Sequence, residues 1–371
     1  MNKYIQLGLL FSVAAFASAK ANAQSSVTLY GILDVGIRMD THQTATGGKL
    51  FTMGNGGAMS SNRWGLLGKE DLGGGMRAFF QLENGFTPNT GAFQNATPSG
   101  GVREFGRTAL VGLGSDKYGA ISIGRQYALV HEMVAAHDVF ALSNYSGTYG
   151  FQASGLTGGG RLDNSIRYTS PAIAGIVVTG SYTLGGVSGD FHRYTSPAVS
   201  VNYTNGPLSV GSTYQIVNDI GGLTPASTEY GSTYYGVTMP DSTQKMFTIG
   251  STYKIGKATL YASYIYSHVY PADYKNDSFS VAALYYVTPS FSIRLPVYVD
   301  FLHHASTSGT RITTGPVFDY AFSKTTDVYI GADYTHLTGA WTTLAASPTF
   351  TLPFNGYNSL LEVMVGLRHA F

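Results

Sequence analysis

The last twelve residues of the chain alternate apolar side chains with polar or small ones and end on an aromatic residue. Successive side chains of a strand point to opposite sides, so this segment has one apolar and one polar face. The apolar face carries Leu361, Val363, Val365, Leu367 and Phe371, and the other carries Glu362, Gly366, Arg368 and Ala370. The wall of a membrane β-barrel has lipid on one side and water on the other, and this pattern predicts such a strand.

Similar strand-like segments recur from Val27 onwards, and their connections alternate between short and long. The short connections are turns rich in Gly, Pro, Asn and Ser, at residues 71–74, 115–119, 170–172, 205–207, 255–257, 288–289 and 323–325. The long connections are residues 39–59, 85–104, 128–163, 185–197, 218–243, 268–276, 302–310 and 335–356. These connections predict an all-β fold, a 16-stranded antiparallel transmembrane β-barrel with short periplasmic turns and long extracellular loops. A barrel of sixteen strands is wide enough for an aqueous channel.

The N-terminal residues have the features of an export signal. Lys3 gives a positive start, residues 7–19 are too short an apolar run to span a bilayer, and Ala21-Asn22-Ala23 resembles a cleavage site. We therefore expect residues 1–23 to be a cleaved signal peptide and residues 24–371 to form the barrel. The chain has no cysteine, so closure by hydrogen bonds has to replace disulfides in an oxidising compartment.

Composition excludes several function classes. Without Lys3 and Lys20, the mature chain carries 20 basic and 21 acidic residues, and this balance does not indicate a nucleic-acid partner. Gly158-Gly159-Gly160 lacks the Lys of a phosphate loop, and His303-His304 would point to opposite faces of a strand. We find no ligand-spaced cluster or nucleophile elbow, and we predict neither a cofactor, a metal nor an enzyme.

Several motifs, taken in order, resemble the general porins of beta-proteobacteria, of the neisserial and Burkholderia type. They lie at residues 26–31 with Asp34, 62–75, 81–86, 111–113, 123–127, 163–168 and 366–371, and so cover the mature length. The resemblance implies a homotrimer in the outer membrane, with the third loop folded into each pore. Here that loop, residues 128–163, has few acidic residues and a Gly-rich tail, so its charge departs from the family pattern.

Fixed charge in the lumen is the predicted filter. Parity places Arg63 and Arg167 opposite their apolar neighbours, so both should face the lumen. Arg107 and Arg125 share parity with apolar residues, and only the family pattern or a local bulge turns them inward. Arg161 ends the third loop, which carries Glu132 and Asp138. This basic wall facing a sparsely acidic loop predicts passive diffusion of small hydrophilic solutes and ions with a weak anion preference.

Contacts between subunits are expected, by analogy with the family, on the outward faces of the first and last strands. The candidates are Trp64, Leu66, Leu110, Gly112, Val363 and Val365. A substrate-specific porin for sugars or organic acids is the main alternative, and Tyr145, Tyr149 and Phe151 of the third loop could form its solute track. A barrel enzyme or a non-conducting adhesin would need fewer strands or a narrower barrel.

Overall fold

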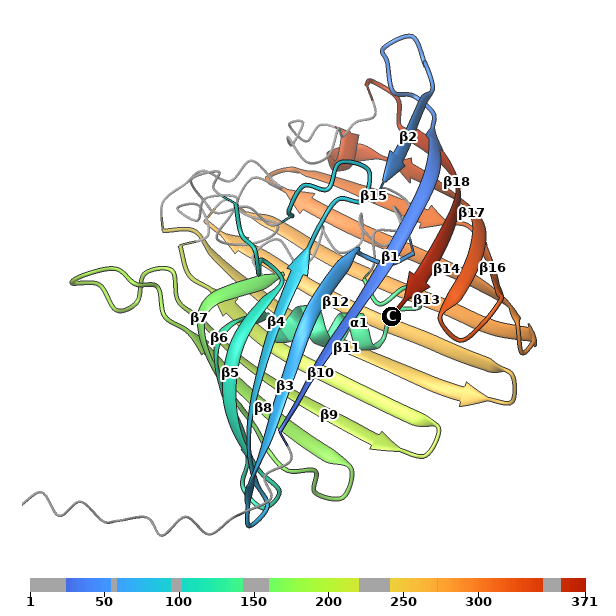
Figure 1. The fold of residues 1–371 in the computed structure, drawn as a ribbon. Coiled ribbons are helices and arrows are strands. Elements are labelled where there is room, and N and C mark those ends of the chain that lie inside the picture. The colour runs from blue at the N-terminus through green and yellow to red at the C-terminus, as the bar shows by residue number, and fades with distance from the viewer. Residues whose placement is uncertain are drawn as a thin grey trace, which may run out of the picture.

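Strands form nearly all of the structure and join into one closed antiparallel sheet (Figure 1). The computed structural model describes residues 25–54, 59–94, 102–142, 160–219, 241–271, 273–342 and 355–371. The strands are β1 (Ser26–Asp40), β2 (Leu50–Gly54), β3 (Arg63–Gly73), β4 (Met76–Gly85), β5 (Thr108–Ser115), β6 (Gly119–Tyr127), β7 (Arg161–Thr169), β8 (Ile176–Thr183), β9 (Ser196–Asn205), β10 (Leu208–Val217), β11 (Thr243–Ile255), β12 (Ala258–Tyr270), β13 (Tyr274–Thr288), β14 (Phe291–His304), β15 (Thr307–Thr314), β16 (Val317–Ala321), β17 (Thr326–Leu337) and β18 (Ser359–Ala370). Helical elements are α1 (Leu129–Ala136) and the 3-10 helix η3 (Gly339–Thr342). Within the described ranges, no helix is long and apolar enough to cross a membrane.

Two wall strands are interrupted, which reduces the eighteen strand segments to sixteen positions around the barrel. β2 and β3 both pair with the same edge of β1, one along its second half and one along its first. β15 and β16 likewise share the space between β14 and β17 and are separated by Gly315-Pro316. Proline has no N–H to donate to a ladder, which explains the second break. The predicted sixteen-stranded barrel is confirmed.

Side chains divide between two faces of this wall as the sequence pattern predicts. In β1, Val27 and Leu29 are 65% and 59% exposed, whereas Asp34 is fully buried inside the barrel. In β18, Val365 and Leu367 are about half exposed, and Glu362 on the other face is buried. We therefore place the apolar outer surface against lipid. Closure of the sheet pairs the polar backbone groups of every strand and so hides them from hydrocarbon.

Closure joins the first strand to the last. Gly31 and Phe371 exchange two backbone hydrogen bonds of 3.0 Å, and the register continues from Ile32 opposite Ala370. A Cβ atom at Gly31 would lie 2.3 Å from the Phe371 ring, so only glycine fits beneath the terminal aromatic residue.

The short turns lie where the sequence places them, but two of the predicted long loops are wrong. Strand β12 continues to Tyr270 and β13 begins at Tyr274, so three residues join them. Only Ala305 and Ser306 join β14 and β15. Cross-strand pairing continues to Val269 opposite Tyr274 and to His304 opposite Thr307, so both hairpins end in short turns.

Candidate functional site

The chain after β6 turns into the barrel and forms α1 inside the ring of strands (Figure 1). Residues Val130, Met133 and Val134 are buried on one side of this helix. They pack against the inner wall, in a cluster with Val217, Met246 and Ile265 of β10, β11 and β12. Burial of this apolar face fixes the third loop to one side of the lumen and leaves Glu132 on the other side of the helix.

A buried turn anchors the loop beyond the helix. The Asp138 carboxylate accepts hydrogen bonds from the backbone N–H groups of Phe140 and Leu142, both at 3.0 Å, and from the Tyr298 hydroxyl at 2.7 Å. Val139 and Phe140 then pack with Met59 and with apolar side chains of β13, β16, β17 and β18. Asp138, predicted as an acidic group of the filter, is 5% exposed and serves as an anchor instead.

Three arginines lie close to Glu83 and Tyr127 on the inner side of the wall. Arg107 donates to Glu83 at 2.6 Å, and Arg63 lies 3.7 Å from the same side chain. Arg161 joins them through Tyr127, and we call Arg63, Arg107, Arg161, Glu83 and Tyr127 the arginine cluster. Its formal charge is positive because it holds three guanidinium groups and only one carboxylate.

Tyr127 lies at the centre of the arginine cluster. Its hydroxyl accepts hydrogen bonds from Arg107 and, at 2.7 Å, from Arg161, whose guanidinium also lies 4.3 Å from the ring centroid. The imidazole ring of His131 in α1 also stacks on the Tyr127 ring, and the two ring centroids are 4.9 Å apart. The ring therefore links the wall strands β6 and β7 to the helix, and one hydroxyl group sets the direction of two guanidinium groups.

The position of α1 inside the barrel shifts the pKa values of two of its side chains, His131 and Glu132. Burial, together with Arg161 and Arg107, holds the pKa of His131 well below its ordinary value, so this ring stays neutral near pH 7. Burial within the barrel also raises the pKa of Glu132, against the opposing effect of Arg167. One terminal nitrogen of Arg167 donates to both oxygens of Glu132, at 2.9 and 3.0 Å, and its other terminal nitrogen donates to the Tyr127 carbonyl.

Arg125 belongs to a different group of charges. It donates to Asp163 at 2.7 Å and to the Gly106 carbonyl at 2.7 Å, and Arg103 binds the same carboxylate at 2.8 Å. A register shift between Gly124 and Gln126 confirms the local bulge in β6. Arg125 therefore pairs with Asp163 rather than with Glu83, and its predicted place in the constriction stays a prediction.

Acidic side chains collect on another sector of the inner wall, which the sequence analysis did not identify. Asp40, Glu362 and Asp333 are paired neighbours across β1, β18 and β17, with Arg38 bound to the first two. Further along the same strands and β16, Asp34, Asp319 and Asp327 surround Arg368, which is joined to Asp319 and Asp327 by ion pairs. The lumen therefore has a basic sector on β3 to β7 and an acidic one on β16 to β1, which creates a transverse field.

The sequence matches the family of Gram-negative porins over residues 10–340. The chain belongs to this family. It is 28% identical over 372 residues to outer membrane porin protein 32 of Delftia acidovorans, covering 96% of this chain and 97% of that one. A porin of Bordetella pertussis is 32% identical over 229 residues, and the match spans 56% of this chain and 57% of that protein. The major outer membrane protein P.IB of Neisseria meningitidis is 27% identical over 55% of this chain and 58% of its own length. The predicted resemblance is confirmed.

Solved structures agree on the fold. The anion-selective porin from Comamonas acidovorans superimposes with a TM-score of 0.74 at 24% identity, over 94% of this chain and all of that one. A trimer form of OmpT from Vibrio cholerae gives 0.64 at 18% identity, over 94% and 99% of the two chains. The family match and the relative covered over its whole length make the protein an outer-membrane porin, a passive channel, and its family indicates a channel rather than an enzyme.

The porin wall places most of the predicted contact residues on its outer face. Trp64 and Leu66 share the face of Leu29, and Val363 and Val365 share that of Leu367. Leu110 and Gly112 are on the inner face instead, directly opposite Gln81 and Phe79, and the prediction was wrong for them. Successive side chains of a strand point to opposite faces, and in β5 the outward side chains are Val111 and Leu113.

Several residues of the porin lumen were missed or cannot be placed. The central roles of Tyr127, His131 and Tyr30 were missed, although Tyr127 directly follows a predicted wall strand and precedes the loop. Tyr30 donates to Glu83 at 2.8 Å and accepts from Gln81 at 2.8 Å, so it fixes that carboxylate. Tyr145, Tyr149 and Phe151, the predicted solute track, and the predicted signal peptide lie outside the described residues.

Proposed function

We propose that this porin passes small hydrophilic solutes with a weak preference for anions. The observation that carries the proposal is the arginine cluster, in which Arg63 and Arg107 pair with Glu83 and Arg161 is bound to the neighbouring Tyr127 hydroxyl, so that three guanidinium groups face one carboxylate. Glu132 of the facing helix does not offset this charge, because it is bound to Arg167. The relative from Comamonas acidovorans is described as anion-selective, which agrees with this proposal.

Reversal potentials across a planar bilayer under a KCl gradient test the proposal. A unit charge about 6 Å from the path of an ion changes its energy by about 0.7 kcal/mol in water, which is roughly a threefold change in occupancy. We expect Arg107→Gln and Arg161→Gln each to lower the chloride-to-potassium permeability ratio by such a factor. Lys117→Gln, which removes an exposed lysine of the β5–β6 turn, is the matched control. A cation-selective wild type, or a ratio unchanged in both variants, would refute the assignment.

We also propose that the functional unit is a homotrimer in outer-membrane lipid. β1 pairs with β3 on one edge and with β18 on the other, so these two strands are only one strand apart. The outward side chains Trp64, Leu66, Val363 and Val365 therefore lie on neighbouring parts of the outer wall. Apolar side chains on this part of the outer wall can pack against the wall of a second barrel. Cross-linking in mild detergent should give a trimer, and Trp64→Arg should reduce it. An intact wild-type monomer would contradict this arrangement.

A further inference from the structure

One row of inward-facing residues crosses five wall strands below the helix. The register pairs Lys69 of β3 with Phe79 of β4, then Phe79 with Gly112, Gly112 with Ser122 and Ser122 with Arg167. Directly opposed residues have Cβ atoms about 5 Å apart, so the ammonium stem of Lys69 starts beside the Phe79 ring. The row thus places a cation at each end and an aromatic ring between them.

The Phe79 ring is held over the glycine of the next strand. A Cβ atom at Gly112 would lie 2.3 Å from the ring, so the absent side chain gives the ring its place on the wall. Leu67 and Leu110 lie two residues along their strands on the same inner face, and Leu67 is 43% exposed. These three side chains make an apolar floor within an otherwise polar lumen.

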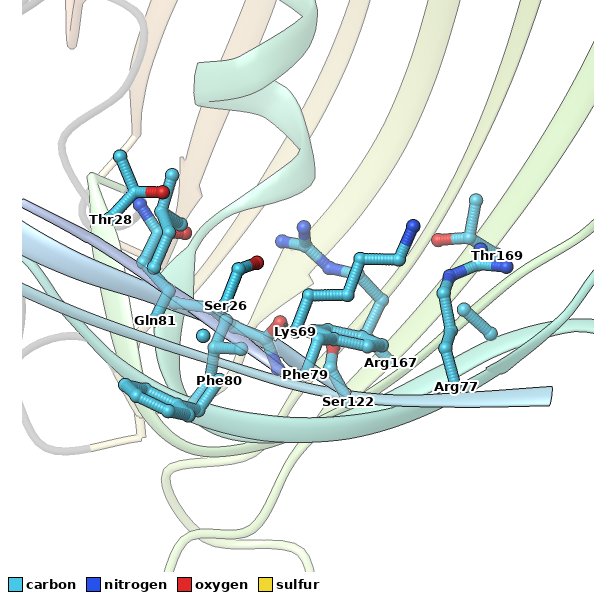
Figure 2. Close-up of a pocket in the computed structure, with 15 residues that line it drawn as sticks. Ser26, Thr28, Lys69, Arg77, Phe79, Phe80, Gln81, Ser122, Arg167 and Thr169 are labelled. Atoms are coloured by element: carbon cyan, nitrogen blue, oxygen red, sulfur yellow. Dashed lines mark hydrogen bonds between the residues drawn. The ribbon is translucent and has the colours of Figure 1, made fainter. Parts of the chain in front are cut away.

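A hollow of about 520 Å³ lies over this floor. Figure 2 shows the Lys69 amine and the Arg167 guanidinium on the same side of the strands as Ser26, while the Phe80 ring points the other way. Polar groups that line it include Ser122, Gln126 and Thr169, and none of its lining residues is acidic. The hollow is therefore positive at its edges and apolar at its base.

The cations at the two ends differ in availability. Arg167 is held by Glu132, and Arg77 at the lower rim donates to Asp116 at 2.8 Å. Lys69 has no hydrogen-bond or ion-pair partner among the described residues. An ammonium group beside an aromatic ring can bind the carboxylate of a solute whose own apolar ring packs on the aromatic surface.

We propose that this hollow binds small aromatic carboxylates of the benzoate type. The ring of the solute packs on Phe79 and beside Leu67 and Leu110, and its carboxylate meets the Lys69 ammonium, with Ser122 and Arg167 at the far side. Inorganic anions and acetate could bind the Lys69 ammonium but have no ring to pack on the apolar floor. The inference rests on the proposed channel function and adds a solute class to it.

Block of the KCl current by added solute tests the site on the intact porin in planar bilayers. Benzoate should reach half-block at a concentration at least about threefold lower than acetate, since an aromatic pair supplies a gain of that order. Phe79→Leu keeps an apolar side chain but removes the ring, and should bring benzoate close to acetate. Lys69→Gln should raise the half-blocking concentration of both anions. Lys117→Gln, which removes an exposed lysine of the β5–β6 turn, should change neither.

The outcomes separate this inference from the proposed function. Equal block by benzoate and acetate in the wild type, or benzoate block unchanged in Phe79→Leu, would overturn the binding site while the KCl current remained. A wild type without any KCl current would overturn the channel itself. Gly112→Ala gives a second variant, because its Cβ would displace the Phe79 ring and should weaken benzoate block selectively.

Discussion

Single side chains decide where the fixed charges of this lumen point. Tyr127 shows this most clearly, because its hydroxyl accepts from Arg107 and Arg161 while its ring lies between Arg161 and His131. Removing that hydroxyl leaves two guanidinium groups without a shared acceptor. Both would gain freedom to move away from the path of the ions.

We expect Tyr127→Phe to lower the chloride-to-potassium permeability ratio while the conductance changes little. A neutral acceptor for a charged donor contributes about 1.5 to 3 kcal/mol, enough to release at least one guanidinium group. Reversal potentials measure the ratio. Tyr168→Phe is the matched control, since that hydroxyl donates to the Tyr118 carbonyl outside the lumen. An unchanged ratio in Tyr127→Phe would show that the hydroxyl does not orient the arginines.

Glu132 gives the lumen a pH dependence whose sign follows from its raised pKa. As the pH falls, the Glu132 carboxylate takes up a proton at a pH above its ordinary pKa of 4.5, and its ion pair with Arg167 is then lost. We expect the chloride preference to rise as the pH falls from 7 towards 4.5. Glu132→Gln should show the raised preference already at pH 7 and lose that pH step. The same pH step persisting in Glu132→Gln would assign it to another group.

A raised carboxyl pKa also sets the direction of the effect on stability. The folded state favours protonated Glu132 more than the unfolded state does, so folding gains stability as the pH falls through the raised pKa. Acid is therefore not expected to release α1 through this residue.

Parity along a strand predicted some of these positions and missed others. Arg63 and Arg167 are on the inner face as alternation requires, because regular pairing surrounds both. Arg125 lies in the bulge itself, between Gly124 and Gln126, and parity cannot be counted through an inserted residue. The partner of Asp138 is Tyr298, 160 positions further along the chain, and no local pattern indicates such a contact.

At the scale of elements, the third loop is held to the wall by its own two anchors rather than by strand pairing. The apolar face of α1 packs on β10 to β12, and the turn at Asp138 is bound to β14. The sequence predicted that this loop enters the lumen only through the family resemblance. Its helix is short, and periodicity over eight residues does not separate it from a loop.

Asp138→Ala should release the second anchor. The change removes acceptors for two backbone N–H groups and one hydroxyl, which we expect to cost the docked loop about 3 kcal/mol. Single-channel conductance should rise and become noisier, while the thermal unfolding of the barrel should change little. Tyr298→Phe removes one of the three donors and should have a smaller effect. A conductance equal to that of the wild type in Asp138→Ala would mean that helix packing alone holds the loop.

At the scale of the whole molecule, closure of the barrel depends on the contact between Gly31 and Phe371. Gly31→Val would place side-chain atoms inside the Phe371 ring and against the Arg63 carbonyl. We expect the ratio of folded, heat-modifiable protein to unfolded protein on gels to fall at least about tenfold at a given urea concentration, because a loss of about 1.4 kcal/mol lowers this equilibrium constant tenfold. Gly180→Ala in β8, where a Cβ would meet nothing within 4 Å, is the control. Equal folded fractions in both would show that the seam tolerates a side chain.

The barrel itself was predictable because its wall repeats one rule sixteen times. Alternation and the short turns fixed the strand number even though two loop lengths were wrong, since hairpins of any loop length contribute two strands. The distribution of charge was less predictable. The acidic sector on β16 to β1 arises from residues that are distant in sequence and become neighbours only when the barrel closes.

Single-channel recording with ions of graded size tests the central claim, that this chain encloses a water-filled pore. Purified protein in a planar bilayer should give discrete current steps in KCl, and the steps should shrink as the ions become larger and vanish at a cut-off. Chloride should carry more of the current than potassium. Bilayers that stay electrically tight, although the protein is inserted and folded, would contradict the account.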